Sequence, residues 1–123
     1  MSISRICLLC VMLLSVQPVL AATAPLREMA GILVNLEHYP AAGEKVRLKE
    51  IAASKDSTEQ EKTIANALIN LKHTANDADK AKLKQMQADD KLPSDVRNLA
   101  GIILNLNHTA SAADKEKLHQ MMK

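Results

Sequence analysis

The sequence predicts an all-α protein of three helix-turn-helix repeats, about six short helices in all, packed as a compact solenoid-like array or bundle. Three observations lead to this fold class. A tetrapeptide recurs with a fixed period, apolar residues follow helical spacing before each copy, and capping residues mark where helices begin. We expect a single domain behind an N-terminal signal peptide, because 123 residues leave room for no more than one.

The recurring tetrapeptide is Asn-Leu-x-His, found at residues 35–38, 70–73 and 105–108. Its period is therefore 35 residues in both intervals. Similarity extends over about 25 positions of each copy, and a fixed period of this size is typical of helical repeat arrays. The predicted domain covers residues 25–123, with units at about 25–56, 57–91 and 92–123. Duplication of one unit is the simplest explanation.

Each unit is predicted to contain two helices joined by a short turn. The first helix of the first unit runs from about Pro25, a residue suited to a first turn, to His38. Ser94 is the predicted N-cap of the corresponding helix in the third unit. Asn76 and Ser111 are predicted to cap the second helices of the later units, and an aspartate follows each of them three residues on.

The two helices of a unit differ in composition. In the first helix, apolar residues cover an arc of roughly 200° on a helical wheel, which is wide enough for burial against several neighbours. The second helix has fewer apolar residues and more lysines, so we expect it to form an outer, solvated layer. Opposite the apolar arc of the first helix lies a polar stripe, made of Arg27, Gly31, Asn35 and His38, then Lys62, Asn66, Asn70 and His73, then Arg97, Gly101, Asn105 and His108.

The first 22 residues are predicted to be a cleaved signal peptide. A short basic segment ends at Arg5, residues 6–16 form an almost unbroken apolar run, and Pro18 precedes small residues where cleavage fits after Ala21 or Ala22. The run is too short to cross a membrane, which requires about 20 apolar residues. The protein is therefore predicted to be exported, either periplasmic or secreted, with no stable membrane span in the mature chain.

The composition of the mature chain excludes several classes of function. Both cysteines, Cys7 and Cys10, lie in the predicted signal peptide, which excludes disulfides, thiolate metal ligands and a cysteine nucleophile. Loss of Arg5 with the signal leaves 15 basic against 14 acidic side chains, a balance that argues against nucleic-acid binding. Tyr39 is the one aromatic residue, so stacking platforms for bases or sugars are absent.

The recurring histidines His38, His73 and His108 suggest a metal site, because neutral imidazole is a common ligand of transition metals. In a stack of repeats, however, equivalent residues are separated by one or two helix spacings of about 8–10 Å, too far to share one ion. Only a closed, three-fold-like arrangement of the helices would bring them together. We therefore favour a structural role in which each His binds the last free carbonyl groups of its helix.

Asn35, Asn70 and Asn105 recur at one position although Asn is unfavourable inside a helix. A structural interpretation is that each side chain donates hydrogen bonds to the following turn or to a neighbouring helix and so fixes the repeat interface. A functional interpretation is a row of amides along a groove that holds extended peptide backbone. The structural interpretation is favoured.

No enzyme motif is present, so no catalytic residue and no cofactor are expected. We predict a small exported, non-catalytic module that binds another protein or a peptide through the repeat surface. The candidate binding residues are the three Asn and the three His of the tetrapeptides. The alternative is a periplasmic metal-binding protein that uses His38, His73 and His108 for Cu or Zn.

Overall fold

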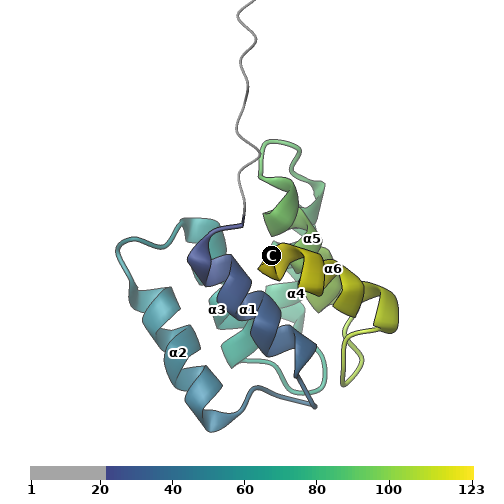
Figure 1. Ribbon diagram of the computed structural model, residues 1–123. Helices are drawn as coiled ribbons and strands as arrows, with labels where there is room; N and C mark the ends of the chain where they lie inside the picture. Colours follow the sequence, from purple (N-terminus) through teal and green to yellow (C-terminus); the bar gives the residue numbers. More distant parts are fainter. Residues whose placement is uncertain (1–21) are drawn as a thin grey trace, which may run out of the picture.

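The computed structural model describes residues 22–123, so the predicted signal peptide, with both cysteines, lies outside the described residues apart from Ala22. Over this range the chain forms six α-helices and no β-strand, in a compact arrangement (Figure 1). They are α1 (Ala24–Val34), α2 (Ala42–Ala53), α3 (Glu59–Ile69), α4 (Asp77–Ala88), α5 (Ser94–Leu104) and α6 (Ala112–Met122). The predicted all-α class and the expected number of short helices are confirmed.

The helix starts follow the capping residues in most places. The side chains of Asn76 and Ser111 accept hydrogen bonds from the backbone N–H groups of the aspartates three residues later, as predicted. The prediction for Ser94 is wrong, since Pro93 is the N-cap and Ser94 is the first helical residue. Pro93 has an extended backbone with ψ of 147°, so it is the last residue outside the helix, and it offers no side-chain acceptor.

The helix ends differ from the prediction. The first helix was expected to reach His38, but α1 ends at Val34 and Asn35 is its C-cap. α3 and α5 end in the same way, with Asn70 and Asn105 as C-caps. The physical reason is the Leu that follows each Asn: it is buried, and the chain must leave the helix to turn this side chain into the core.

The helices pair in a pattern that closes on itself. α2 packs mainly against α3, α4 against α5, and α6 returns to pack against α1, which places the last helix beside the first (Figure 1). Gly31 of α1 lies at this contact, where a β-carbon would stand 3.5 Å from the terminal methyl of Met122, an ordinary van der Waals distance. The two terminal helices therefore cover each other, and the array has no free end.

The core is built from residues that recur every 35 positions. Each of the inner helices α1, α3 and α5 contributes a large apolar side chain at two shared registers, and each of the outer helices contributes a leucine at a third. These fully buried sets are Met29, Ile64 and Leu99, then Leu33, Leu68 and Ile103, then Leu48, Leu83 and Leu118. All nine side chains belong to one hydrophobic core.

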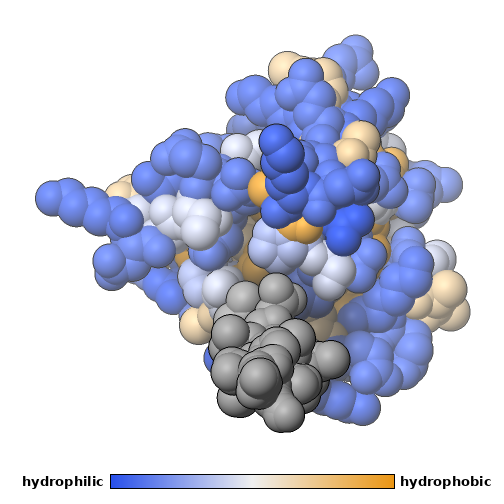
Figure 2. Space-filling model, turned by 90° about the horizontal axis from the view of Figure 1, so that it is seen from above, coloured by the Kyte–Doolittle hydropathy of each residue, from blue (hydrophilic) through white to orange (hydrophobic). Residues whose placement is uncertain are grey.

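The helices α2, α4 and α6 form the solvated layer, as expected from their lysines. Each buries only two or three side chains, and most of its remaining positions are exposed. Figure 2, which looks onto the end of the molecule where α1 begins, shows a largely hydrophilic face with small hydrophobic spots around the grey atoms. None of the helices in residues 22–123 has the length and apolar character needed to cross a membrane.

Candidate metal centre

Each Asn-Leu-x-His tetrapeptide forms the exit from an inner helix. In the second copy, the backbone N–H of Asn70 closes the last helical turn on the carbonyls of Asn66 and Leu68. Leu71 then enters the core, where it is 1% exposed. His73 follows two residues later on the exposed side of the chain. The tetrapeptide therefore ends the helix, anchors the loop and turns a histidine outward.

A buried residue lies on each side of this histidine, two positions away. Leu71 lies two residues before His73 and Ala75 two residues after it, and both side chains are buried. The first copy has Leu36 and Pro40 at these positions, and the third has Leu106 and Ala110, all buried as well. The chain must reverse direction between two points fixed in the core, so the residue in the middle is pushed to the surface.

The reversal is a γ-turn centred on the histidine. The backbone N–H of Tyr39 donates to the carbonyl of Glu37 at 2.8 Å, and the equivalent bonds across His73 and His108 measure 2.6 and 2.8 Å. The histidine φ angles are 71°, 64° and 69° in chain order, the only positive values of non-glycine residues in the described part of the chain. A γ-turn of this hand is rare and strained. Such a conformation costs about 1–3 kcal/mol for each residue and is found preferentially at functional sites.

The three turns are joined by a closed ring of backbone hydrogen bonds. The N–H of His38 donates to the carbonyl of His108 at 2.9 Å, that of His73 donates to His38 at 2.9 Å, and that of His108 donates to His73 at 3.1 Å. Figure 1 shows the three loops that carry these turns converging at its lower end. Each histidine backbone is thus both donor and acceptor in the ring, which fixes the three side chains relative to one another.

The imidazole rings converge on one point above this ring. The Nδ1 atoms of His38 and His73 are 3.2 Å apart, those of His38 and His108 3.1 Å, and those of His73 and His108 2.9 Å. The ring planes are steeply inclined to one another, at 70° to 83°, and the ring centroids are 4.7 to 5.0 Å apart. All three side chains are exposed, so the point between them is open to solvent.

The structural role predicted for the histidines is wrong in its geometry. The rings do not bind the last carbonyl groups of their helices, because each helix ends four residues before its histidine. They face one another instead, since α6 closes on α1 and brings the third turn beside the first. The closed arrangement that the metal hypothesis required is the one present.

The three asparagines do not converge in this way. All are exposed C-cap residues. The side chain of Asn35 donates to the carbonyl of Gly31 in its own helix at 3.2 Å, and that of Asn70 donates to the Asp79 carboxylate in α4 at 3.3 Å. The Asn70 bond has the form that the structural interpretation predicted, a bond to a neighbouring helix, whereas the Asn35 bond stays within its own helix.

Three mutually adjacent ring nitrogens cannot satisfy one another by hydrogen bonding alone. Each Nδ1 is either a donor or an acceptor, depending on its tautomer. In any triangle of such atoms, at least two neighbours must carry the same role, so at least one contact brings two lone pairs or two protons together. A cation held between three acceptor lone pairs removes this conflict for all three contacts.

The spacing suits a transition metal. An ion about 2.1 Å from each nitrogen holds its ligands about 3.0 Å apart at octahedral angles and about 3.4 Å apart at tetrahedral angles. The observed separations of 2.9 to 3.2 Å match one triangular face of an octahedron, and small movements of the rings would give three corners of a tetrahedron. Either geometry leaves at least one coordination position open on the exposed side.

Comparison of the chain with protein-family models, with curated proteins and with solved structures finds no match. The chemistry of the centre is therefore inferred from its own residues.

Proposed function

We propose that this protein is exported, that its three repeats close into a ring, and that it binds one divalent transition-metal ion through Nδ1 of His38, His73 and His108. One observation supports this most directly: the three Nδ1 atoms lie within 2.9 to 3.2 Å of one another. Chance proximity of surface histidines does not explain why every one of them also occupies a strained γ-turn.

Imidazole nitrogen is a borderline ligand that suits Zn, Cu and Ni, and affinity for a given nitrogen site increases from Co²⁺ to Cu²⁺. The site offers no thiolate and no carboxylate, so hard cations such as Mg²⁺ and Ca²⁺ are disfavoured. We expect Cu²⁺ and Zn²⁺ to bind most tightly. An exposed three-ligand site fits a protein that holds or transfers metal outside the cytoplasm.

The protein- or peptide-binding function that the sequence first suggested stays a prediction. Its best candidate residues were the asparagines, and two of these already bond within the fold. Metal binding uses the histidines of the same tetrapeptides and is favoured by their convergence. The two functions are compatible, because the asparagine and histidine side chains are directed to different partners.

Isothermal titration calorimetry of the chain from residue 23 onward, with Zn²⁺ and with Cu²⁺, tests the proposal. We expect one ion for each chain, and a loss of affinity of more than about 100-fold in His73→Ala, since even outer partners of metal ligands contribute 10- to 100-fold. His119→Ala is the matched control, because His119 is exposed on α6 outside the cluster. No binding by the unmodified chain, or equal binding by the His73→Ala variant, would contradict the proposal.

A further inference from the structure

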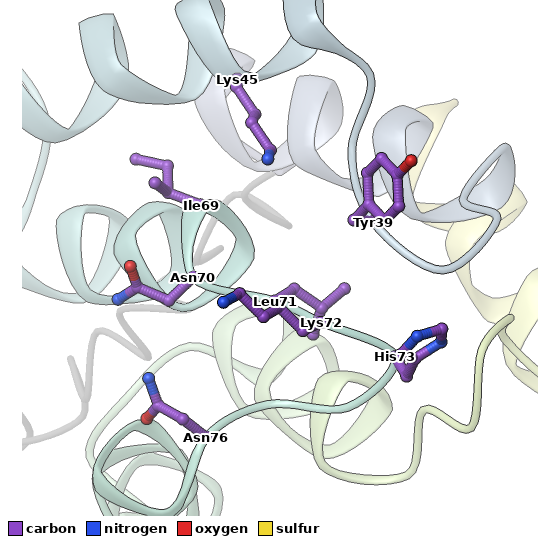
Figure 3. A pocket seen from close by; sticks show the side chains of 8 residues that line it. All are labelled: Tyr39, Lys45, Ile69, Asn70, Leu71, Lys72, His73 and Asn76. Carbon is purple, nitrogen blue, oxygen red and sulfur yellow. The ribbon is translucent and has the colours of Figure 1, made fainter.

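A pocket of about 700 Å³ opens directly beside the histidine cluster. It lies between the loop and first turn of α2 on one side and the loop between α3 and α4 on the other (Figure 3). His73 forms part of its lining, so one ligand of the proposed metal belongs to both sites. A molecule bound at the open position of the metal could therefore extend into this pocket.

The lining combines positive charge with apolar surface. Lys45 and Lys72 supply two amino groups, and the Lys45 amino group lies 5.4 Å from the centre of the Tyr39 ring. Tyr39 and the half-buried Ile69 contribute apolar surface. Figure 3 shows Lys45 reaching from α2 toward the loop that carries Lys72. None of the described side chains that line the pocket is acidic, so the pocket is electrostatically suited to an anion.

The repeats allow the lining of the pocket to be compared with the corresponding residues of the other repeats. Lys45 corresponds to Lys80 and Lys115, so a lysine is present at this position in all three. Lys72, in contrast, corresponds to Asn107 and Glu37. The pairs Lys45 with Lys72, Lys80 with Asn107 and Lys115 with Glu37 therefore carry charges of +2, +1 and 0.

The aromatic ring is also confined to one repeat. Tyr39 corresponds to Thr74 and Thr109, which are too small to form an apolar wall. The second lysine and the tyrosine, which differ from the corresponding residues of the other repeats, occur together in the pocket beside His73. These two differences thus lie on one side of a centre whose histidines are the same in all three repeats.

We propose that this pocket binds a small organic dicarboxylate that also coordinates the metal. One carboxylate occupies the open position of the ion held by the three histidines, and the other pairs with Lys45 and Lys72. The hydrocarbon part of the ligand packs against Tyr39 and Ile69. The inference rests on the proposed metal binding and adds a ligand class to it.

Titration of the Co²⁺-loaded protein with succinate tests this inference, because the visible spectrum of Co²⁺ reports a change in its ligands. We expect succinate to change the spectrum and to bind about tenfold more tightly than propionate, which has a single carboxylate. Neutral succinamide should have no effect. Lys72→Ala and Lys45→Ala should each weaken succinate binding about tenfold while Co²⁺ remains bound.

Lys80→Ala is the matched control. Lys80 occupies the same register as Lys45 in the next repeat, so its removal changes the net charge equally but leaves the proposed pocket intact. Succinate affinity should change by less than about twofold. Co²⁺ binding without any effect of succinate, or an equal loss in the Lys80 variant, would overturn this inference and leave the metal site standing. Failure of Co²⁺ to bind would overturn both.

Discussion

The histidine and the asparagine of each tetrapeptide are three residues apart in the sequence, yet their three copies behave differently in space. The histidines converge until their Nδ1 atoms are within 3.2 Å of one another. The asparagines stay at the ends of three separate helices, and those at positions 35 and 70 bond to different elements. Recurrence is equally strong for both residues, so recurrence alone does not identify a site.

The difference between them is the element to which each belongs: the histidines lie in three turns that are hydrogen-bonded to one another, whereas the asparagines cap three separate helices. In a closed ring, every set of equivalent residues surrounds one axis, but only residues close to that axis can share a ligand. The histidine turns meet one another, and a buried Leu and a buried Ala or Pro anchor each turn on both sides of the histidine. The following predictions assign a separate role to each residue of the tetrapeptide. The leucine should contribute most to stability, the histidine should bind the metal and carry the backbone strain, and the asparagine should contribute a single hydrogen bond.

The largest effect on stability is expected at the leucine between the two polar residues. Leu71→Ala removes a side chain that is 1% exposed and leaves a cavity beneath the turn of His73. The free energy of unfolding should fall by about 2–5 kcal/mol, as measured by chemical denaturation. A loss below about 1 kcal/mol would show that the loop is not anchored in the core.

Saturation with metal should stabilise the folded chain through the histidines. At a Zn²⁺ concentration about 100 times the dissociation constant, the expected gain is about 2.7 kcal/mol, measured as a rise in melting temperature. Asn70→Ala should leave the rise intact, whereas His108→Ala should abolish it.

Glycine substitution should have opposite effects at the two polar positions in the absence of metal. At His73, where φ is 64°, glycine relieves strain, and we expect a net gain of about 1 kcal/mol in His73→Gly. At Asn70, where φ is −85°, glycine relieves nothing and adds flexibility, so Asn70→Gly should lose about 0.5–1 kcal/mol. Chemical denaturation of both variants measures the two changes in the free energy of unfolding. A decrease in both variants would mean that the turn is not strained.

The smallest effect is expected from loss of the Asn35 side chain. Its single hydrogen bond joins exposed groups of the same helix end, so Asn35→Ala should lower the free energy of unfolding by about 0.5 kcal/mol. Thermal denaturation should show a small decrease in the melting temperature. A loss of several kcal/mol would give the asparagine the interface role predicted from the sequence.

The period and the capping residues were sufficient to predict the helix class, the solvated outer helices and two of the N-caps. They could not predict closure, because the rotation from one repeat to the next depends on how side chains of different units pack. The histidine geometry depends on closure and was missed with it. A signal was nevertheless present: an open array requires terminal repeats with polar outer faces, and here apolar residues such as Met29 and Met121 lie in the first and last helices and are buried.

The position of each histidine also carried a signal that only the structure makes clear. Between a buried Leu and a buried Ala or Pro four residues on, the middle residue must face solvent, and a helix that ends at the preceding Asn leaves room for a tight turn. Lys72 and Tyr39 could not be assigned from the sequence, because they belong to different repeats and meet only in the folded chain.

Whether three histidines hold one ion together can be read from histidine side-chain ¹H–¹⁵N NMR during a Zn²⁺ titration. We expect the Nδ1 signals of His38, His73 and His108 to shift in parallel and to reach their end points at one equivalent of Zn²⁺, while the signals of His119 do not move. Separate saturation of the three histidines, or a shift of only one or two of them, would contradict this expectation.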